Sequence, residues 1–207
     1  MDNLALADER RGAQRHSLML RAAKVLAPTG EFVCSVREVS ATGLRLRFYH
    51  AQPLDPFLLL ELGNGERYPL EVVWRRDDLL GARFGEPIDV SDFMAEPSPF
   101  ERRKLRVRLN RGALLTSGGR DYRARLLDLS QQGARIELGS QIDPLATVRL
   151  EVPGMPLRFG HVRWRDGFAH GLFFDHALRL DEFARHVFAL TQGTAPDPAG
   201  APERRYA

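Results

Sequence analysis

Apolar and polar residues alternate along several short stretches of the chain, and these stretches recur in both halves. The clearest are residues 43–48, Gly-Leu-Arg-Leu-Arg-Phe, and residues 133–138, Gly-Ala-Arg-Ile-Glu-Leu. Because successive side chains of a strand point to opposite faces, this alternation predicts strands that are buried on one face. Weaker stretches of the same kind predict further strands at residues 19–26, 57–62, 68–74, 81–84, 113–116, 122–128, 146–152, 157–164 and 171–174.

Five or six short strands per hundred residues are typical of a small closed barrel, because closure removes the exposed edges of a sheet. One segment has helical periodicity instead: residues 181–191 place Phe183, Val187, Phe188 and Leu190 on one side. The pattern therefore predicts an all-β fold with minor α content. The helix is interpreted either as a plug for a barrel or as a face for a partner.

The chain repeats itself with a shift of ninety residues, and such self-similarity sets the domain count. Both tryptophans of the chain fall in this register. The aligned pairs are Ser40 with Ser130, Gly43 with Gly133, Trp74 with Trp164, Arg75 with Arg165, Gly81 with Gly171 and Phe84 with Phe174. Upstream, Glu9-Arg10-Arg11 with Arg15 matches Glu101-Arg102-Arg103 with Arg106 only at a shift of 91 or 92, which requires single-residue insertions. We interpret the repeat as a duplication that gives two tandem six-stranded antiparallel barrels.

The prolines divide the chain further. Residues 85–100 mix prolines and acids without strand or helix periodicity, which is typical of a linker, and residues 193–207 contain three prolines and little to bury. The sequence thus predicts a first barrel at 1–90, a linker at 91–100, a second barrel with its helix at 101–192, and a disordered tail at 193–207.

Charge separates the two halves. Residues 1–92 carry 12 basic and 14 acidic side chains, whereas residues 93–207 carry 18 and 13. Nine Arg or Lys side chains lie within residues 102–125 against one acid, Asp121, which creates a local field that attracts anions. The chain has 28 Arg and two Lys, so abundance of arginine alone proves little and position has to carry the argument.

The positions that do so are Arg102 and Arg106, followed by Asp128, Ser130 and Gly133. Two guanidinium groups suit phosphate oxygens and the O6/N7 edge of guanine, and they can stack on a purine. A carboxylate accepts from the N1 and N2 donors of guanine. A serine adds a small polar group, and a glycine allows a positive φ or a close approach to a ligand. Together these groups describe a receptor for a guanine nucleotide that bears phosphate.

At these residues the sequence resembles the PilZ domain family, whose signatures are RxxxR and, about twenty residues later, [D/N]xSxxG. Residues 101–107, Glu-Arg-Arg-Lys-Leu-Arg-Val, and 127–136, Leu-Asp-Leu-Ser-Gln-Gln-Gly-Ala-Arg-Ile, match both without departure. The resemblance covers roughly residues 9–90 and 100–178, and it implies a barrel that binds the bacterial second messenger cyclic di-GMP. The ligand-binding residues that it implies are Arg102, Arg103, Arg106, Asp128, Ser130 and Gly133.

The first copy departs from the family pattern. Glu38 stands where the family has Asp or Asn, and the extra methylene moves the carboxylate enough to disturb a fixed base contact. Two interpretations stay open, a second ligand site and a structural or dimerisation role. The candidate second site comprises Arg11, Arg15, Glu38, Ser40 and Gly43.

Each of these residues also has a purely structural interpretation. The arginines at 102, 103 and 106 fit a solvated charge run, and Asp128 with Ser130 fits the cap of a β-turn. Trp74 and Trp164 are interpreted as packing residues of the core or the barrel rim rather than as platforms for bases.

Other sites are not expected. Cys34 is the only cysteine, so no intrachain disulfide or cysteine-based zinc site forms within one chain, and its apolar neighbours predict a buried, inert thiol. The six histidines show no ligand spacing, so neither a metal nor a cofactor is expected. No signal segment or long apolar run is present, which predicts a cytoplasmic protein without membrane insertion. No motif for a catalytic nucleophile or a phosphate-cradling loop occurs, and we expect no enzyme.

Three functions compete. The first is a cyclic di-GMP receptor that signals to an unidentified protein partner by conformational change, with the ligand ordering residues 93–108 and fixing the angle between the barrels. The second is a PilZ-like interaction module that no longer binds the nucleotide. The third, a weak nucleic-acid binder, is disfavoured because no aromatic run is interleaved with the basic stretch, so no DNA partner is expected.

Overall fold

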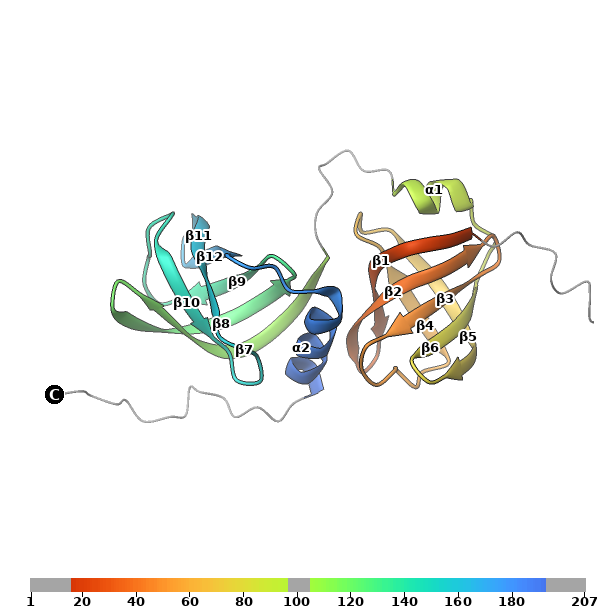
Figure 1. The fold of residues 1–207 in the computed structure, drawn as a ribbon, viewed down its shortest axis with the longest axis horizontal. Helices are drawn as coiled ribbons and strands as arrows, with labels where there is room; N and C mark the ends of the chain where they lie inside the picture. Colours follow the sequence, from red (N-terminus) through yellow and green to blue (C-terminus); the bar gives the residue numbers. More distant parts are fainter. Residues whose placement is uncertain (1–15, 97–104, 193–207) are drawn as a thin grey trace, which may run out of the picture. The chain divides into compact units, whose positions relative to one another are not determined.

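The computed structural model describes residues 16–96 and 105–192. Over these residues the chain forms two closed six-stranded antiparallel barrels, each followed by a helix (Figure 1). The fold class predicted from the alternation of apolar and polar residues is thus confirmed. No helix of the described residues is long and apolar enough to cross a membrane.

The first barrel has the strand order β1-β2-β3-β6-β5-β4 and closes by pairing β4 with β1. Its register at the closure is set by Lys24 opposite Glu61 and Val25 opposite Leu60. The strands are β1 (His16–Ala27), β2 (Gly30–Ser40), β3 (Gly43–Phe48), β4 (Phe57–Glu61), β5 (Arg67–Arg76) and β6 (Leu79–Phe84).

The second barrel repeats this topology, with the order β7-β8-β9-β12-β11-β10 and closure between β10 and β7. Here Leu114 lies opposite Glu151 and Leu115 opposite Leu150. The strands are β7 (Arg106–Ser117), β8 (Arg120–Ser130), β9 (Gly133–Leu138), β10 (Thr147–Glu151), β11 (Arg158–Asp166) and β12 (Ala169–Phe174).

The two barrels share one pattern of buried positions at the ninety-residue shift. Inward-facing side chains that are almost fully buried in both are Val25 and Leu115, Val36 and Leu126, Leu46 and Ile136, and Leu60 and Leu150. Each such aliphatic side chain stabilises the fold by about 1.5–3 kcal/mol when it is removed from water. Closure of each sheet around this aliphatic core positions the outward-facing residues between the core positions.

The starts of the first strands can be compared between the two copies. Strands β1 and β7 are both 12 residues long and begin at His16 and Arg106, a shift of ninety. The expected match of Arg15 to Arg106 needs a shift of 91, and Arg15 lies outside the described residues, so this match stays a prediction.

Two strands were missed or shortened by the sequence pattern. Strand β2 was indicated only by the apolar neighbours of Cys34 and had no predicted bounds, because residues 32–36 are all buried and no alternation marks them. Strand β7 begins at Arg106, seven residues before the predicted start at 113. The exposed side chains at positions 106, 108 and 110 are charged or polar, and Val107 between them is buried.

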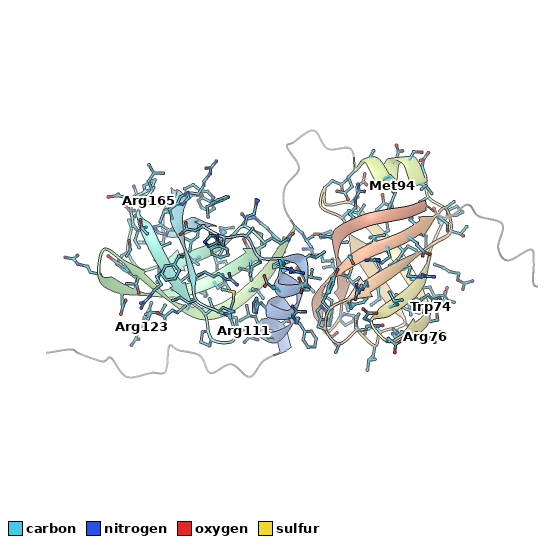
Figure 2. All side chains as sticks on the ribbon, in the orientation of Figure 1. Trp74, Arg76, Met94, Arg111, Arg123 and Arg165 are labelled. Carbon is cyan, nitrogen blue, oxygen red and sulfur yellow. The ribbon has the colours of Figure 1, made fainter. Side chains whose placement is uncertain are left out.

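Helix α2 (Leu180–Gln192) confirms the predicted helix and extends it by one residue at each end. Phe183, Val187 and Leu190 are buried. Arg111 on β7 donates from Nε to the Leu190 carbonyl oxygen at 2.5 Å and from Nη2 to the Thr191 carbonyl oxygen at 3.4 Å (Figure 2). A strand arginine therefore satisfies carbonyl groups in the last turn of the helix, which have no partner within the helix.

Helix α1 (Val90–Ala95) lies where the sequence analysis expected a linker without helix. Asp89 caps it by accepting from the backbone amides of Ser91 and Asp92 at 2.7 and 3.1 Å. Its one buried residue, Phe93, packs its ring 5.1 Å from Tyr68 and 5.9 Å from Phe84. A helix of six residues with one buried side chain shows no periodicity, which is why the pattern missed it.

The only cysteine, Cys34, is buried, as expected. Burial raises the pKa of its thiol far above the usual range because no charge compensates the cost of removing the thiolate from water. The thiol therefore stays protonated and unreactive at neutral pH.

Candidate functional site

Strands β7, β8 and β9 bring four of the predicted site residues together on the outer face of the second barrel. Arg106 pairs with Ser130 across β7 and β8, and Ser130 pairs with Gly133 across β8 and β9. Asp128 lies in the next row, where its register partner on β9 is Arg135. Two rows of adjacent strands thus assemble residues that are up to 29 positions apart in the sequence.

The charged pair of this face is Arg106 with Asp128. The Nη1 atom of Arg106 lies 2.5 Å from Oδ1 of Asp128, and the two side chains are 47% and 16% exposed. Only the Arg106 end of the pair is open to water, which screens its charge, whereas the Asp128 carboxylate is largely covered. A ligand can therefore compete for this contact from the side of Arg106.

Ser130 and Gly133 have structural roles in the turn between β8 and β9. The Ser130 side chain is buried, and its hydroxyl donates to the Gly133 carbonyl oxygen at 3.1 Å, as in a turn cap. A positive φ was one of the two reasons expected for a glycine at position 133. Gly133 is not among the described residues with positive φ, so this reason is wrong. A Cβ there would lie 2.0 Å from the carbonyl oxygen of Leu172, so Gly133 allows strand β12 to approach closely, and the approach of a ligand stays a prediction.

Two further residues extend the face, and the sequence analysis did not assign them to it. Arg135 pairs with Gly171 on β12, and Gly171 pairs with Trp164 on β11, so the row of Asp128 continues to an indole. Trp164 is 39% exposed, and its Nε1 would lie 2.1 Å from a Cβ at Gly171. The indole thus packs against the glycine on the barrel surface, so Trp164 is a packing residue as expected, but it does not lie in the core. The pairing of each tryptophan with a glycine seven residues later was the available signal.

Arg135 differs from its charged neighbours. It is exposed, and among the described residues it has no hydrogen-bond or ion-pair partner. In the strand register Arg135 lies between Asp128 on β8 and Gly171 on β12, in the row that ends at Trp164.

The predicted arginines upstream of Arg106 fall outside the described residues. These are Arg102 and Arg103 for the second barrel, and Arg11 and Arg15 for the first. Their assignment to the two sites stays a prediction.

The first barrel has the same rows with a different arrangement of charges. Glu38 pairs in register with Arg45, Arg45 with Gly81, and Gly81 with Trp74, whose indole lies on the barrel surface (Figure 2). Here Nη1 of Arg45 lies 2.9 Å from Oε1 of Glu38, and the Arg45 guanidinium lies over the Trp74 ring, 5.8 Å from its centroid. The carboxylate is thus bound by the arginine of its own row.

The turn of the first barrel repeats that of the second. The Ser40 hydroxyl donates to the Gly43 carbonyl oxygen at 3.1 Å, and a Cβ at Gly43 would lie 2.7 Å from the carbonyl oxygen of Ala82. A hollow of about 650 Å³ lies on this face, and its lining includes Glu38, Ser40, Gly43, Arg45, Trp74 and Gly81.

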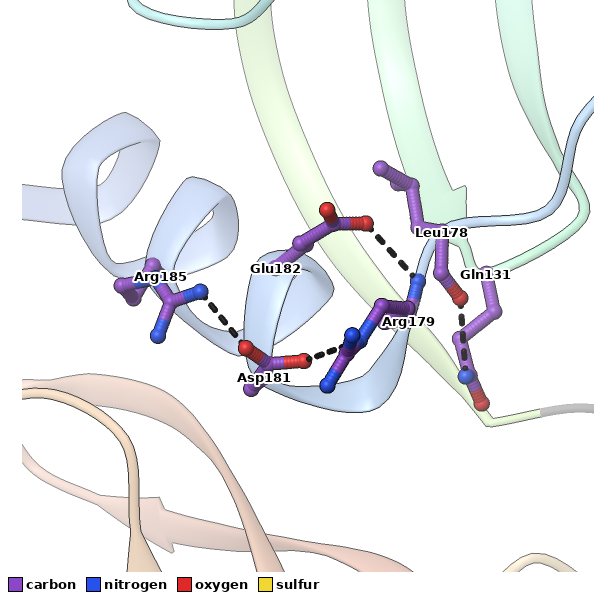
Figure 3. Close-up of polar contacts among 6 residues, drawn as sticks. All are labelled: Gln131, Leu178, Arg179, Asp181, Glu182 and Arg185. Atoms are coloured by element: carbon purple, nitrogen blue, oxygen red, sulfur yellow. Dashed lines mark hydrogen bonds and ion pairs between the residues drawn. The ribbon is translucent and has the colours of Figure 1, made fainter.

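The β8–β9 turn of the second barrel is bonded to the segment that leads into α2. Gln131 donates from Nε2 to the Leu178 carbonyl oxygen at 3.0 Å, and the Leu178 amide donates to the Gln131 carbonyl oxygen at 2.7 Å (Figure 3). The first barrel keeps the backbone bond, from the Ile88 amide to the Ala41 carbonyl oxygen, but the Ala41 side chain has no hydrogen-bond donor.

The first turn of α2 is itself held by charges (Figure 3). The Arg179 amide donates to Glu182 at 3.0 Å, in the reciprocal half of a capping box. Asp181 accepts from Arg185 at 2.7 Å and from Arg179 at 3.3 Å. The hydrogen bond from Arg185 lowers the pKa of Asp181 below its ordinary value, so the carboxylate stays charged at the positive end of the helix.

A comparison with protein-family models finds a match in the second half of the chain. The family model of the PilZ domain matches residues 100–189, which include all of the second barrel. No curated protein matches the sequence.

Three solved structures resemble the chain weakly. The PlzA protein of Borreliella burgdorferi in complex with c-di-GMP is 13% identical, with 89% of this chain and 97% of that chain covered and a TM-score of 0.33. YcgR of Escherichia coli in complex with c-di-GMP is 14% identical, with 83% and 84% covered and a TM-score of 0.32. The Bacillus subtilis inhibitor of motility, MotI, is 12% identical, with 86% and 95% covered and a TM-score of 0.34. At these scores the similarities support no conclusion about how this chain works.

Proposed function

We propose, on the premise that residues 100–189 of this chain are a PilZ domain, that the protein is a cytoplasmic bacterial receptor for cyclic di-GMP, not an enzyme. The ligand binds on the outer face of β7, β8 and β9. One observation carries the proposal: Arg106, half-exposed, meets the largely covered Asp128 in the same face as an unpaired Arg135 and an exposed Trp164. These are the groups that a guanine nucleotide with phosphates requires.

Each group has a role that follows from its chemistry. The Asp128 carboxylate exchanges its contact with Arg106 for the N1 and N2 donors of guanine, which form two parallel hydrogen bonds. The Arg106 guanidinium is then free to bind a phosphate or the O6/N7 edge of the base. Arg135 offers a second guanidinium to the same ligand, and Trp164 offers an apolar plane for a purine.

The remaining predicted residues support the site indirectly. Ser130 and Gly133 shape the β8–β9 turn and the approach of β12, so they position Asp128 rather than touch the ligand. Arg102 and Arg103 complete the RxxxR segment of the family pattern and add positive charge for a dianion. Their contribution stays part of the proposal.

We propose that ligand binding is transmitted from the β8–β9 turn to α2. Gln131 lies in the turn that follows Asp128 and makes two bonds to Leu178, two residues before α2 begins. A ligand that shifts this turn therefore shifts the start of the helix, and the size of the effect is limited by the difference in ligand affinity between the two arrangements. The predicted ordering of residues 93–108 concerns in part residues 97–104, which lie outside the described residues.

A second candidate function, a protein-interaction module without ligand, has its own support. Phe159 and Phe173 are 53% and 39% exposed on the outer face of β11 and β12, where the first barrel has Pro69 and Arg83. Exposed aromatic side chains of this kind are enriched in protein interfaces. This function predicts a thermal midpoint that cyclic di-GMP does not change, whereas a receptor is stabilised by its ligand. Neither function requires DNA.

Calorimetric titration of the full chain with cyclic di-GMP tests the proposal. We expect binding that Arg106→Ala weakens roughly 10- to 100-fold, as for loss of a hydrogen bond to a charged group. The matched control is Arg149→Ala, which removes an exposed arginine of the same barrel that pairs with Glu151 at 2.8 Å. Equal effects of the two substitutions, or no binding by the unmodified chain, would overturn the proposal.

A further inference from the structure

The outer face of the first barrel contains an acid, an arginine and an indole in one row, and this arrangement has a chemical meaning of its own. The Arg45 guanidinium is planar, donates to the Glu38 carboxylate at 2.9 Å, and lies over the Trp74 ring. Guanine presents the same features: a planar ring with two adjacent N–H donors that match a carboxylate, and a face that stacks on an indole. Arg45 thus makes the contacts that a bound guanine would make.

We infer that the first barrel carries a second guanine-binding site, formed by Glu38 and Trp74 and occupied by Arg45. The inference rests on the guanine chemistry proposed above for the second barrel, but it concerns a different barrel and different residues. The hollow of about 650 Å³ on this face, lined by these three residues, has room for a nucleobase.

The contact of Arg45 is an imperfect one, so a ligand can replace it. Arg45 reaches Oε1 of Glu38 through Nη1, while its Nε atom is buried without a hydrogen-bond partner. A buried donor without a partner is unfavourable. Guanine in the same place forms two bonds to the carboxylate, and Arg45 on leaving it regains water at Nε.

In the second barrel the corresponding arginine does not bind the acid, and this difference is why only the site of the first barrel is occupied by an arginine. Asp128 is one methylene shorter than Glu38, and it pairs with Arg106 on β7. Arg135, the counterpart of Arg45, has no hydrogen-bond or ion-pair partner among the described residues. The longer acid of the first barrel reaches the arginine on β3, and this contact holds the guanidinium over the indole.

The test follows the fluorescence of Trp74 in a chain that carries Trp164→Phe, which leaves Trp74 as the only tryptophan. The probe is guanosine, which has no phosphate, so that removal of an arginine does not change its attraction to the protein. We expect Arg45→Ala to raise the affinity for guanosine about tenfold, since an exposed ion pair and a cation–π contact each contribute a factor of a few. Adenosine, which lacks the N1 and N2 donors, is expected to give no comparable change.

The matched control is Arg47→Ala. Arg47 lies two residues further along β3, pairs with Asp78 at 2.6 Å and lies over Tyr49 at 5.6 Å, so it has the same kinds of contact away from Trp74. We expect this substitution to leave the guanosine affinity unchanged. A second variant, Glu38→Asp, keeps the carboxylate but shortens its reach to Arg45, and we expect it to raise the affinity in the same direction.

Three results would overturn the inference: no gain for Arg45→Ala and Glu38→Asp in folded protein, an equal gain for Arg47→Ala, or equal binding of adenosine. Calorimetry with cyclic di-GMP on Arg45→Ala without the Trp164 substitution separates this outcome from failure of the proposed function. If the second barrel still binds the dinucleotide while Trp74 does not respond to guanosine, only the inference about the first barrel fails.

Discussion

The two barrels have the same topology and the same buried positions, yet their outer faces are arranged differently. At the ninety-residue shift, Val36 and Leu126 are both fully buried, whereas Glu38 and Asp128 make different ion pairs. Glu38 binds Arg45 on the neighbouring β3, and Asp128 binds Arg106 on the neighbouring β7. The two barrels therefore share their inward-facing residues, whereas the outward-facing acid of each barrel pairs with an arginine on a different strand.

A second difference lies where each barrel closes. The first barrel has Lys24, 6% exposed, in contact with Glu61 at 2.9 Å, and Arg67 contacts the other carboxylate oxygen at 2.8 Å. The second barrel has Leu114 opposite Glu151 at the same place. The same closure is thus made once with a buried charge and once with an aliphatic side chain, which makes the two barrels unequal in their response to mutation and to acid.

The largest effect is expected for Glu61→Gln, which removes the carboxylate from the buried Lys24. Breaking a buried ion pair on one side costs about 3 kcal/mol or more, because the other charge stays buried. The free energy of unfolding, measured with urea, checks this. Glu151→Gln is the control: its partner Arg149 is 44% exposed, and the loss is expected to be below about 1 kcal/mol. Equal losses would show that burial of Lys24 does not matter.

The pair of Lys24 and Glu61 also makes the free energy of unfolding depend on pH. Burial by itself would raise the pKa of Glu61, but hydrogen bonds and charge from Lys24 and Arg67 outweigh it and lower the pKa below the ordinary value. A depressed carboxyl pKa stabilises the folded state above the unfolded pKa of about 4.3, and this contribution is lost as the pH falls through the folded value. Glu61→Gln is therefore expected to flatten the acid limb of the stability curve. An unchanged acid limb would contradict the assignment.

The next effect concerns ligand affinity. Asp128→Ala is expected to weaken cyclic di-GMP binding about 10- to 100-fold, since it removes the acceptor for two guanine donors. Glu38→Ala is expected to change the affinity of the chain less than about twofold, because Arg45 already holds that carboxylate. Calorimetry on the two variants measures both, and the reverse ranking would assign the ligand to the first barrel.

Glycine substitutions sharpen the comparison of the two turns. A Cβ at Gly133 would lie 2.0 Å from a backbone oxygen of β12, and one at Gly43 would lie 2.7 Å from a backbone oxygen of β6. Forcing an atom into such space costs about 1–3 kcal/mol. We expect Gly133→Ala to fall at the upper end and Gly43→Ala at the lower, as measured by thermal unfolding. A larger loss at Gly43 would mean that the close approach in the second barrel relaxes without cost.

The smallest effect is expected for Gln131→Ala, which gives the second barrel the residue type of Ala41 in the first. It removes one side-chain hydrogen bond to Leu178, worth about 1 kcal/mol, and leaves the backbone bond in place. Amide exchange at the start of α2 is expected to become faster and to respond less to cyclic di-GMP. If the response of α2 to the ligand is unchanged, the signal leaves by another route.

The sequence was sufficient to predict two barrels, because periodic alternation and the ninety-residue repeat both report inward-facing positions. It was insufficient where burial is not periodic, as in β2, and where one side chain anchors an element, as Phe93 does in α1. Phe93 and Phe183 also lie ninety residues apart, so extending the repeat past residue 84 would have indicated a first-copy helix.

The candidate site was predictable only in part. The motif residues Asp128 and Arg106 meet, which their spacing suggested, but Arg135 and Trp164 join them through strand register that no local pattern reveals. The role of Gly133 within the turn depends on Leu172 of β12, which lies 39 residues further along the chain. Contacts between distant strands were therefore the missing information.

The central claim is that the second barrel, through the face of Arg106, Asp128 and Arg135, is where cyclic di-GMP binds. Amide hydrogen exchange of the full chain with and without saturating ligand tests it most directly, since exchange reports each barrel separately. The account predicts slower exchange over residues 105–108 and 128–135 at ligand concentrations at which Arg45 still occupies the first-barrel site, so that residues 38–45 are unchanged. Slower exchange over residues 38–45 with no change in the second barrel would contradict it.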